Sequence, residues 1–482
     1  MKVLLVSPES KTWSSRKHIP LGLGYLAAVL EEEGHEVQLW DAAVETQPLE
    51  ELLDRERFDL VGITSVTPLI HEAWEAARQA RERGTITILG GPHPTLMPGE
   101  SLERPEVDLV VRGEAEETIV AVVRQLEKDQ GELDQEGGAR RFASAGWTEI
   151  AGLSYRGAGG EIVHNPPRTA PADLDSLPFP AHHLYKIERY TNLQPRTDGL
   201  DPRARAYTII TSRGCPYQCI YCSKAVTGKT WRPRSPENVI EEWRRLVVDL
   251  RATEIGVTDD VMTLDLERAK RICQLIIDEG LNTVPWITIH GIRADNTDPE
   301  LFQLMKAAGC RRVGFGVESG NQRVLDMMKK GQTIDDVRQA FRNARQAGLQ
   351  TIGFFIFGLP GDDEESMEDT IRLAMELDPD LANFMIAAPF PGTELYQMVI
   401  EQGDLFCHDW RDFAIHDEKA RFAIGDMTAE VVERKWHEAY RRFYLRPGRL
   451  VRKGLRPEFW RRLPAYVSDA RRFFTSRSRS AS

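Results

Sequence analysis

Residues 2–111 alternate between short apolar runs and longer segments in which apolar residues recur every three or four positions. Short runs rich in Val, Ile and Leu predict buried strands, whereas the longer spacing predicts amphipathic helices, several of which close at a glycine. The strand-like runs are KVLLV, EVQLW, DLVGIT, TITILGG and VDLVV. Five such strands with helices between them predict a doubly wound parallel α/β sheet.

A second alternating series begins at AYTIITS, residues 206–212, and ends at LANFMIA, residues 381–387. Its six strand-like runs predict a partial (β/α)6 barrel, a fold that carries functional residues at the C-terminal ends of its strands. Between the two series the chain is rich in Gly, Pro and Asp, which is typical of a connector. We therefore predict four regions: a Rossmann-like domain at 1–135, a connector at 136–205, a partial barrel at 206–400 and a helical C-terminal region with a basic tail at 401–482.

The composition is that of an ordinary globular protein, with 482 residues, 41% of them hydrophobic and 28% charged. This length exceeds what one ordinary core accommodates and agrees with several domains. A membrane span needs about 18 consecutive apolar residues, and the chain contains no such run. The apolar run in MKVLLVSPES is also too short for a signal peptide, and the six cysteines do not resemble a disulfide framework. We therefore expect a cytoplasmic protein.

The charge is distributed unevenly along the chain. The formal net charge is −12, yet residues 441–482 hold 13 Lys and Arg and only 2 Asp and Glu. This tail interleaves arginine with Trp, Phe and Leu. Such a pattern is typical of a helical cap with snorkelling arginines, and also of peripheral contact with an anionic membrane, so both interpretations stay open. No second basic patch accompanies the tail, and we do not expect nucleic-acid binding.

The stretch RGCPYQCIYCSK places Cys215, Cys219 and Cys222 on one loop directly after the first predicted barrel strand. Thiolates at this density suit an iron–sulfur cluster or zinc. A structural zinc site takes four protein ligands, and no further Cys or Cys/His pair at finger spacing stands nearby. A [4Fe–4S] cluster held by three cysteines leaves one iron open to a small molecule.

The sequence CPYQCIYC at the mouth of a β/α barrel resembles the signature of the radical SAM enzymes. The resemblance implies that S-adenosylmethionine (SAM) chelates the open iron through its amino and carboxylate groups. An external electron donor of the flavodoxin or ferredoxin type then starts cleavage to a 5′-deoxyadenosyl radical, which abstracts hydrogen. The resemblance also implies SAM-binding positions at successive strand ends, where Thr258, Asp259 and Asp260 replace the two glycines and glutamate of the family. These positions are Tyr221, Asp259, Asp260, Arg293, Glu318, Ser319 and Gly358.

GLGYLA formally matches the dinucleotide-binding fingerprint, but the first strand stops near Ser7, too far upstream for a tight strand–turn–helix. The loops TSVTPLIHEAW, GGPHPTLMP and VVRGEAEET instead resemble the cobalamin-binding domain that is fused to one large radical SAM subgroup. The resemblance implies that small and polar residues in these loops surround the corrin and its nucleotide tail. They are Ser65, Val66, Thr67, Gly90, Gly91, His93, Gly113, Glu114 and Glu117. Glu114 and Glu117 can accept hydrogen bonds from corrin amides or cap the following helix.

No D-x-H-x-x-G motif, whose histidine ligates cobalt from below in many cobalamin domains, occurs in residues 1–135. We therefore predict no histidine ligand beneath the cobalt, and a lower face that is covered by the loop from Thr64 to Pro68. The histidines of this region, which we interpret as polar loop residues, are His18, His35, His71 and His93.

The leading hypothesis is a cobalamin-dependent radical SAM methyltransferase that transfers a methyl group from methylcobalamin to an unactivated carbon of a small-molecule or lipid-like substrate. An alternative keeps both cofactors without methylation, as a cyclase or rearrangement enzyme similar to the anaerobic magnesium-protoporphyrin ester cyclases. A third hypothesis is a non-catalytic cobalamin sensor or carrier. A carrier has no use for a cluster with an open iron, so the cysteine motif favours an enzyme.

Overall fold

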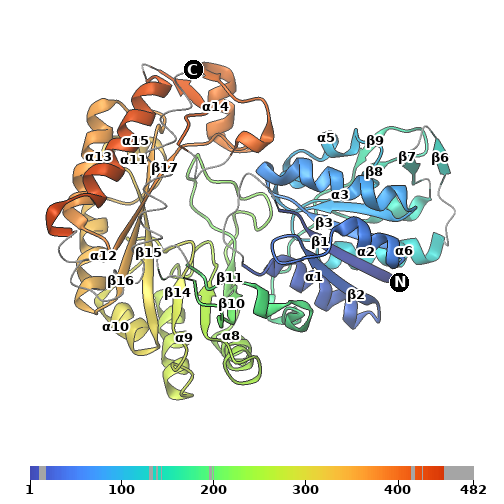
Figure 1. The fold of residues 1–482 in the computed structure, drawn as a ribbon, viewed down its shortest axis with the longest axis horizontal. Coiled ribbons are helices and arrows are strands. Elements are labelled where there is room, and N and C mark those ends of the chain that lie inside the picture. The colour runs from blue at the N-terminus through green and yellow to red at the C-terminus, as the bar shows by residue number, and fades with distance from the viewer. Residues whose placement is uncertain are drawn as a thin grey trace.

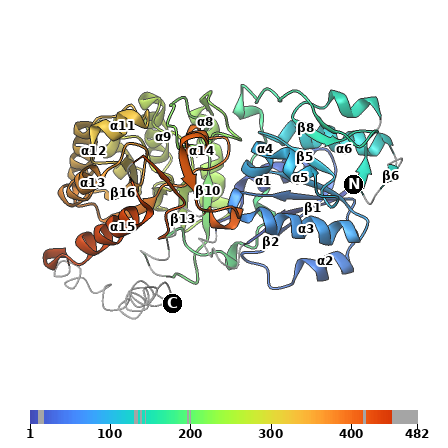
Figure 2. The same cartoon turned by 90° about the horizontal axis from the view of Figure 1, so that it is seen from above.

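The computed structural model consists of two α/β lobes that lie side by side (Figures 1 and 2). It describes residues 1–9, 18–129, 134–136, 139–142, 144–194, 198, 200–413, 418–425 and 427–449. The N-terminal lobe is built on a seven-stranded sheet and the second lobe on a six-stranded sheet. The predicted α/β class with two parallel sheets is confirmed.

The first sheet has the strand order β2-β1-β3-β4-β5-β8-β9, and its first five strands are parallel. All five predicted strands are present, as β1 (Lys2–Ser7), β2 (Glu36–Asp41), β3 (Leu60–Thr64), β4 (Ile86–Gly90) and β5 (Leu109–Val111). The helices of this lobe are α1 (Leu21–Glu32), α2 (Leu49–Arg55), α3 (Ile70–Glu82), α4 (Pro92–Leu96), α5 (Pro98–Leu102) and α6 (Glu116–Asp129).

Strand β1 shows why its sequence is an unbroken apolar run. Val3 and Leu5 pack into the core under α1 and α6, while Leu4 and Val6 pack into the core under α2 and α3. Successive side chains of a strand point to opposite faces, so a strand covered on both faces needs apolar residues at every position.

Two further strands, β8 (Leu153–Arg156) and β9 (Ile162–His164), extend the first sheet in antiparallel orientation beyond β5. The sequence analysis assigned these residues to the connector, because the segment around them is rich in Gly, Pro and Asp. The hairpin pairs the backbone edge that β5 would otherwise expose. A small separate hairpin is formed by β6 (Asp134–Glu136) and β7 (Ala139–Arg141). The sheet therefore continues past residue 135.

The second sheet contains six parallel strands in chain order, and Figure 1 shows them on the inner side of an arc of helices. The six predicted strands are present as β10 (Ala206–Ile209), β13 (Glu254–Val257), β14 (Trp286–Thr288), β15 (Cys310–Glu318), β16 (Gln350–Phe357) and β17 (Leu381–Ile386). The helices that cover them are α8 (Pro236–Arg244), α9 (Leu266–Asp278), α10 (Pro299–Ala307), α11 (Gln322–Met327), α12 (Ile334–Gln346) and α13 (Glu364–Leu377). Strands β10 and β17 lie at the two edges of the sheet, so the predicted partial barrel is confirmed.

Five of these helices begin at a Ser, Thr or Asp whose side chain accepts a hydrogen bond from a backbone N–H of the first turn. The capping residues are Ser235, Asp265, Asp298, Thr333 and Asp363. Four of these caps end the segment that leads from a barrel strand into a helix, and Thr333 ends the segment between α11 and α12. The predicted site residues lie at or after the carboxyl ends of the barrel strands.

The C-terminal region is only partly helical. It contains α14 (Glu394–Gln402), the antiparallel pair β18 (Gly403–Leu405) and β19 (Phe422–Ile424), a short turn η7 (Trp410–Asp412) and α15 (Ala429–Tyr444). Helix α15 lies against β17, where the Trp436 indole donates to the Phe384 carbonyl (2.9 Å) and the Tyr444 hydroxyl to the Ala382 carbonyl (2.7 Å).

The described part of the basic tail follows α15 along the barrel. Arg446 pairs with Asp378 (2.6 Å) and Arg449 donates to the Pro379 carbonyl (3.0 Å). This agrees with the interpretation as a helical cap for residues 441–449. Residues 450–482, on which the predicted membrane contact depends, lie outside the described residues. Within the described ranges, no helix is both long and apolar enough to cross a membrane.

Candidate active site

The two lobes share a cavity of about 260 Å³ at the carboxyl end of the first sheet. Its walls in the first lobe come from the ends of β1, β3, β4 and β5, which is where open α/β sheets bind ligands. The barrel lobe contributes Ile210, Arg213, Val226 and Thr227. Arg213 immediately precedes the cysteine loop, and Val226 and Thr227 lie within it. The cavity and the cysteine loop therefore have a common wall.

The cysteine loop is closed at its base by a short antiparallel pair, β11 (Ser212–Arg213) with β12 (Arg232–Pro233). Inside the loop, the Asp260 carboxylate accepts hydrogen bonds from the Gly214 N–H (3.1 Å) and the Thr227 hydroxyl (2.8 Å). Gly214 has φ +84°, and a Cβ there would lie 2.1 Å from a backbone oxygen. The turn into Cys215 therefore requires glycine.

The three thiols Cys215, Cys219 and Cys222 are unbridged, and Cys222 is exposed. Partial burial and the neighbouring Cys219 sulfur raise the pKa of the Cys215 thiol. Three neighbouring thiolates therefore need compensating cations. Three sulfur ligands on one loop fit a [4Fe–4S] cluster, in which three irons would each have a cysteine ligand and the fourth would stay open to a small molecule.

Glu318, at the end of β15, lies in a buried polar group beside the cysteine loop. Its carboxylate pairs with the Lys330 ammonium (2.7 Å), which lies 3.4 Å from the Tyr221 hydroxyl. Burial and the Glu318 charge raise the pKa of Tyr221. Glu318 also has φ +65°, a strained conformation that is enriched at functional sites. The structure thus brings together two predicted SAM-binding residues and adds Lys330, which the sequence reasoning missed.

Asp259 faces the base of the cysteine loop. Its buried carboxylate accepts hydrogen bonds from the Thr211 N–H, the Thr211 hydroxyl and the Ser212 hydroxyl, all at 2.6 Å. Burial raises the pKa of Asp259. Asp259 and Asp260 therefore both bind backbone or hydroxyl groups that shape the cysteine loop, and direct contact of either with SAM stays a prediction.

Arg293 forms a two-point ion pair with Asp295 (3.0 and 2.8 Å), and its guanidinium lies 3.5 Å from the centre of the Tyr217 ring in the cysteine loop. The remaining predicted SAM positions are structural in this conformation. Ser319 accepts from the Asn321 N–H (3.1 Å), and Gly358, with φ +80°, allows a close approach of α15. Contacts of these residues with SAM stay predictions.

In the first lobe, the loop after β3 packs against the buried side chain of His93. Ser65 donates its N–H to the Gly90 carbonyl (2.9 Å), and Thr67 contacts the His93 ring (3.3 Å). The other ring nitrogen of His93 contacts Glu100 (3.2 Å). Val66, between them, remains 36% exposed. His93 therefore supports the loop from inside, whereas Val66 presents an apolar surface.

The glycines near the cavity leave room for a bulky ligand. Gly113 has φ +77°, and a Cβ there would meet no atom within 4 Å. Gly91 is enclosed instead: with φ +93°, its Cβ would lie 2.8 Å from the Ser65 oxygen. Gly90 lines the cavity beside Val111. An apolar cavity with an open rim at Gly113 fits part of a cobalamin.

Glu114 lies between the lobes and has both carboxylate oxygens engaged by arginines. Arg213 donates to it at 3.0 Å, and Arg232 binds both oxygens. Arg213 also pairs with Glu116 (2.8 Å). Glu117, on the exposed side, pairs with Arg168 (2.8 Å). The predicted corrin contacts of Glu114 and Glu117 stay predictions, and the ionic contact of Glu114 with the cysteine loop is the role that sequence reasoning missed.

The packing around Gly24 accounts for the GLGYLA stretch without a bound dinucleotide. A Cβ on Gly24 would lie 2.3 Å from the Tyr185 hydroxyl, so the glycine admits the connector against α1. The Tyr185 hydroxyl donates to the Pro20 carbonyl (3.1 Å). The motif is therefore a packing feature of the lobe boundary.

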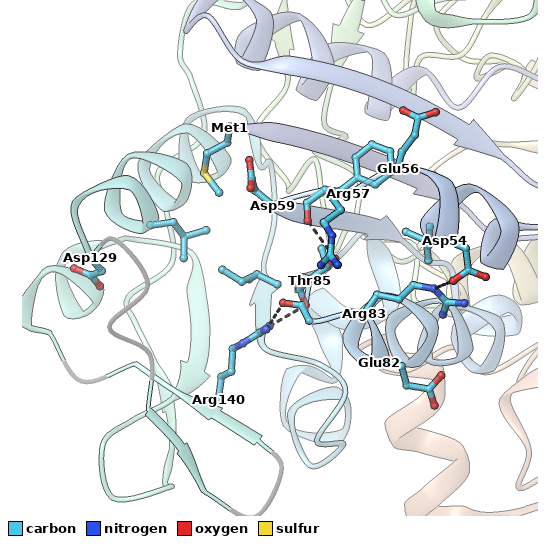
Figure 3. Close-up of a pocket in the computed structure, with 15 residues that line it drawn as sticks. Met1, Asp54, Glu56, Arg57, Asp59, Glu82, Arg83, Thr85, Asp129 and Arg140 are labelled. Atoms are coloured by element: carbon cyan, nitrogen blue, oxygen red, sulfur yellow. Dashed lines mark hydrogen bonds and ion pairs between the residues drawn. The ribbon is translucent and has the colours of Figure 1, made fainter.

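A second hollow, of about 780 Å³, lies at the amino ends of the strands of the first sheet (Figure 3). Two of its arginines form ion pairs. Arg83 pairs with Asp54 (2.7 Å), and Arg140 pairs with Asp108 (2.7 Å) and donates to the Thr85 carbonyl (2.8 Å). It is remote from the cysteine loop, and we do not assign it to the active site.

Comparison with known proteins agrees with this geometry. The radical SAM superfamily model matches residues 209–374, and the B12 binding domain model matches residues 14–123. The chain is 34% identical over 465 residues to the uncharacterized methyltransferase PH0819 of Pyrococcus horikoshii, with 94% of both chains covered. The chain belongs to the cobalamin-binding radical SAM family.

Other members of this family carry related activities. The chain is 30% identical over 443 residues to the cytidylyl-2-hydroxyethylphosphonate methyltransferase of Streptomyces wedmorensis, with 83% of this chain and 82% of that protein covered. A solved structure of the radical S-adenosylmethionine methyltransferase TsrM from Kitasatospora setae superimposes with a TM-score of 0.69 at 20% identity, covering 93% of this chain and 89% of that one. This likeness confirms the predicted fold of a radical SAM enzyme with a cobalamin lobe.

The four histidines of residues 1–135 all have partners within the described residues. The ring nitrogens contact the Leu193 carbonyl for His18 (3.0 Å), the amino terminus for His35 (3.1 Å), Asp409 for His71 (3.1 Å), and Thr67 and Glu100 for His93. That none of them ligates cobalt stays a prediction.

Proposed function

We propose that the chain is a cobalamin-dependent radical SAM methyltransferase that transfers a methyl group to an unactivated carbon of a small molecule. The observation that carries this proposal is the common wall between the cysteine loop and the cavity of the cobalamin lobe, to which Arg213 and Thr227 contribute. Radical formation and methyl delivery then take place on facing sides of one interface. A carrier protein would need only the first lobe.

In this proposal Cys215, Cys219 and Cys222 hold a [4Fe–4S] cluster, which supplies the electron for cleavage of SAM. Tyr221, Glu318 and Lys330 form one polar wall of the SAM site. Their net charge is balanced when Glu318 and Lys330 are both ionised, so the wall can exchange hydrogen bonds with ribose hydroxyls without burying an unpaired charge.

The cobalamin lobe supplies the methyl group through its bound cofactor. The rim at Gly113 would admit part of the ligand, and the loop from Ser65 to Thr67, in which Val66 is exposed, would face it as the resemblance implies. An apolar side chain there would offer the cobalt no ligand. Weak ligation from below would favour release of a methyl group.

A second candidate function is a cyclization without methyl transfer. The chain is 28% identical over 462 residues to the anaerobic magnesium-protoporphyrin IX monomethyl ester cyclase of Rubrivivax gelatinosus, with 92% of this chain and 78% of that protein covered. Two relatives at 30% identity or more carry the name methyltransferase, which favours methylation.

The test uses anaerobically reconstituted protein, SAM with a deuterated methyl group, a one-electron reductant and cell extract. We expect 5′-deoxyadenosine and a metabolite that carries the deuterated methyl group. The Cys219→Ala variant should form neither, whereas Cys407→Ala, which removes a thiol far from the loop in sequence, should form both. Deoxyadenosine without labelled metabolite supports the cyclase alternative. About one zinc and no iron per chain would refute both.

The partners follow from the same site. We infer that a flavodoxin- or ferredoxin-type protein supplies the electron beside Cys222, which is exposed. Peripheral membrane contact through residues 450–482 and a cytoplasmic location stay predictions. Liposome sedimentation of the full chain with and without those residues tests the first of them.

A further inference from the structure

Glu114 holds both ends of the cysteine loop. Arg213 precedes the three cysteines and Arg232 follows them, and the two arginines face each other in the β11–β12 pair. Arg213 and Arg232 both donate to the Glu114 carboxylate. The side chains of all three residues are at most 8% exposed. One carboxylate of the cobalamin lobe therefore binds the closed base of the loop that holds the cluster.

The same segment forms the rim of the cobalamin cavity. Gly113 and Glu114 line the cavity, and the Gly113 N–H donates to the Thr95 hydroxyl (3.1 Å). Arg213 and Thr227 line it from the opposite side. A ligand that fills the cavity must therefore fix the segment that holds Glu114.

Inside the loop, the hydrogen bonds of Asp260 carry this constraint toward the cysteines. Asp260 binds Thr227, which lines the cavity, and the Gly214 N–H, which adjoins Cys215. Arg232 in addition donates to the Thr227 carbonyl (3.0 Å). The contacts thus run without a gap from the cavity wall to the first cysteine.

We propose that Glu114 is a positioning residue that couples cobalamin binding to cluster binding. The proposal rests on the proposed function, because it takes both cofactors as given. Cobalamin and the cluster each order part of the same network of contacts around Glu114. Whichever cofactor binds second therefore meets a site that the first has already ordered. Such coupling is reciprocal and typically changes affinity by about 5–150-fold.

The experiment measures the Kd of hydroxocobalamin for the full chain in two forms, with the cluster reconstituted and with iron removed by a chelator. Absorbance titration under anaerobic conditions reports binding without any need for activity. We expect the wild type to bind at least about fivefold more tightly with the cluster present. In Glu114→Gln, which keeps the shape but removes the charge, the ratio of the two Kd values should fall to about one.

Glu31→Gln is the matched control. Glu31 pairs with His183 of the connector (2.9 Å) and does not line the cavity, so this variant should keep the wild-type ratio. Arg232→Lys retains the charge but loses the two-point contact, and it should also lower the ratio. Circular dichroism shows whether each variant is folded. If Glu114→Gln does not fold, the ratio of the two Kd values in Arg232→Lys tests the coupling instead.

Two results would overturn the coupling alone: equal Kd values for the two wild-type forms, or an unchanged ratio in both folded variants. Wild-type protein that contains its cluster and binds no hydroxocobalamin would overturn the proposed function as well. The outcomes for the coupling and for the function are therefore distinguishable.

Discussion

The buried pair of Glu318 and Lys330 allows a quantitative test of the polar wall beside the cluster. The carboxylate and ammonium lie 2.7 Å apart, and the two residues are 6% and 7% exposed. At an effective dielectric constant of about 20, two charges at this distance attract by roughly 6 kcal/mol, and most of this gain offsets their desolvation. Replacing Lys330 by Met leaves the carboxylate buried and unpaired.

Removal of one partner from a buried pair costs about 3–5 kcal/mol. We therefore expect Lys330→Met to lower the stability of the barrel by about that amount, or its Tm by roughly 6–20 °C. The double variant Glu318→Gln, Lys330→Met should recover most of the loss, because it removes the unpaired charge along with the pair. The free energy of unfolding of both variants is measured by denaturation of cluster-free protein, monitored by near-UV circular dichroism. A loss below about 0.5 kcal/mol in Lys330→Met would show that the carboxylate finds other partners and that the two groups do not act as a pair.

Three more predictions follow from single residues. Gly214→Ala forces a Cβ against a backbone oxygen and should abolish iron binding after reconstitution, whereas Gly228→Ala, with a similar φ of +74° but no atom within 4 Å of its Cβ, should retain iron. Burial raises the pKa of Asp362 from 3.8 to about 6, so this carboxyl group binds its proton more tightly in the folded protein than in the unfolded chain. The folded protein should therefore lose up to about 3 kcal/mol of stability as the pH rises from 4 to 7. Denaturation across this range should show the loss in the wild type, and an equal loss in Asp362→Asn would contradict the assignment. Trp436→Phe removes one of two side-chain donors to the Phe384 carbonyl, the Tyr440 hydroxyl being the other (3.1 Å), and should cost about 0.5–1.5 kcal/mol in the same assay. A loss above about 3 kcal/mol would contradict this reasoning, because it would mean that the hydroxyl does not satisfy the carbonyl.

The sequence predicted the strands well because a parallel strand covered on both faces leaves an uninterrupted apolar run, as Val3 to Val6 show. The hairpin of β8 and β9 escaped detection for the opposite reason. Its strands are short, and its glycine-rich turn resembles a loop, while its stability comes from pairing with the edge of β5. Local pattern carries no information about such a partner.

The cysteine triad could be identified from spacing alone, but the roles of its neighbours could not. Glu114 binds Arg213 and Arg232, which lie 99 and 118 residues further along the chain. Lys330 follows Glu318 by 12 residues, across a helix, and only the fold brings the two charges together. A lysine followed by glycine after that helix was the one local signal, and it is common in surface turns.

Helix α15 has a consequence for how the protein can be shortened. Its aromatic side chains occupy backbone groups along the outer side of β17, which is the last strand of an open sheet. A chain that ends before Ala429 would leave that strand available to pair with strands of other molecules. Such a truncation should therefore produce aggregates, although every residue predicted to surround the cofactors is still present.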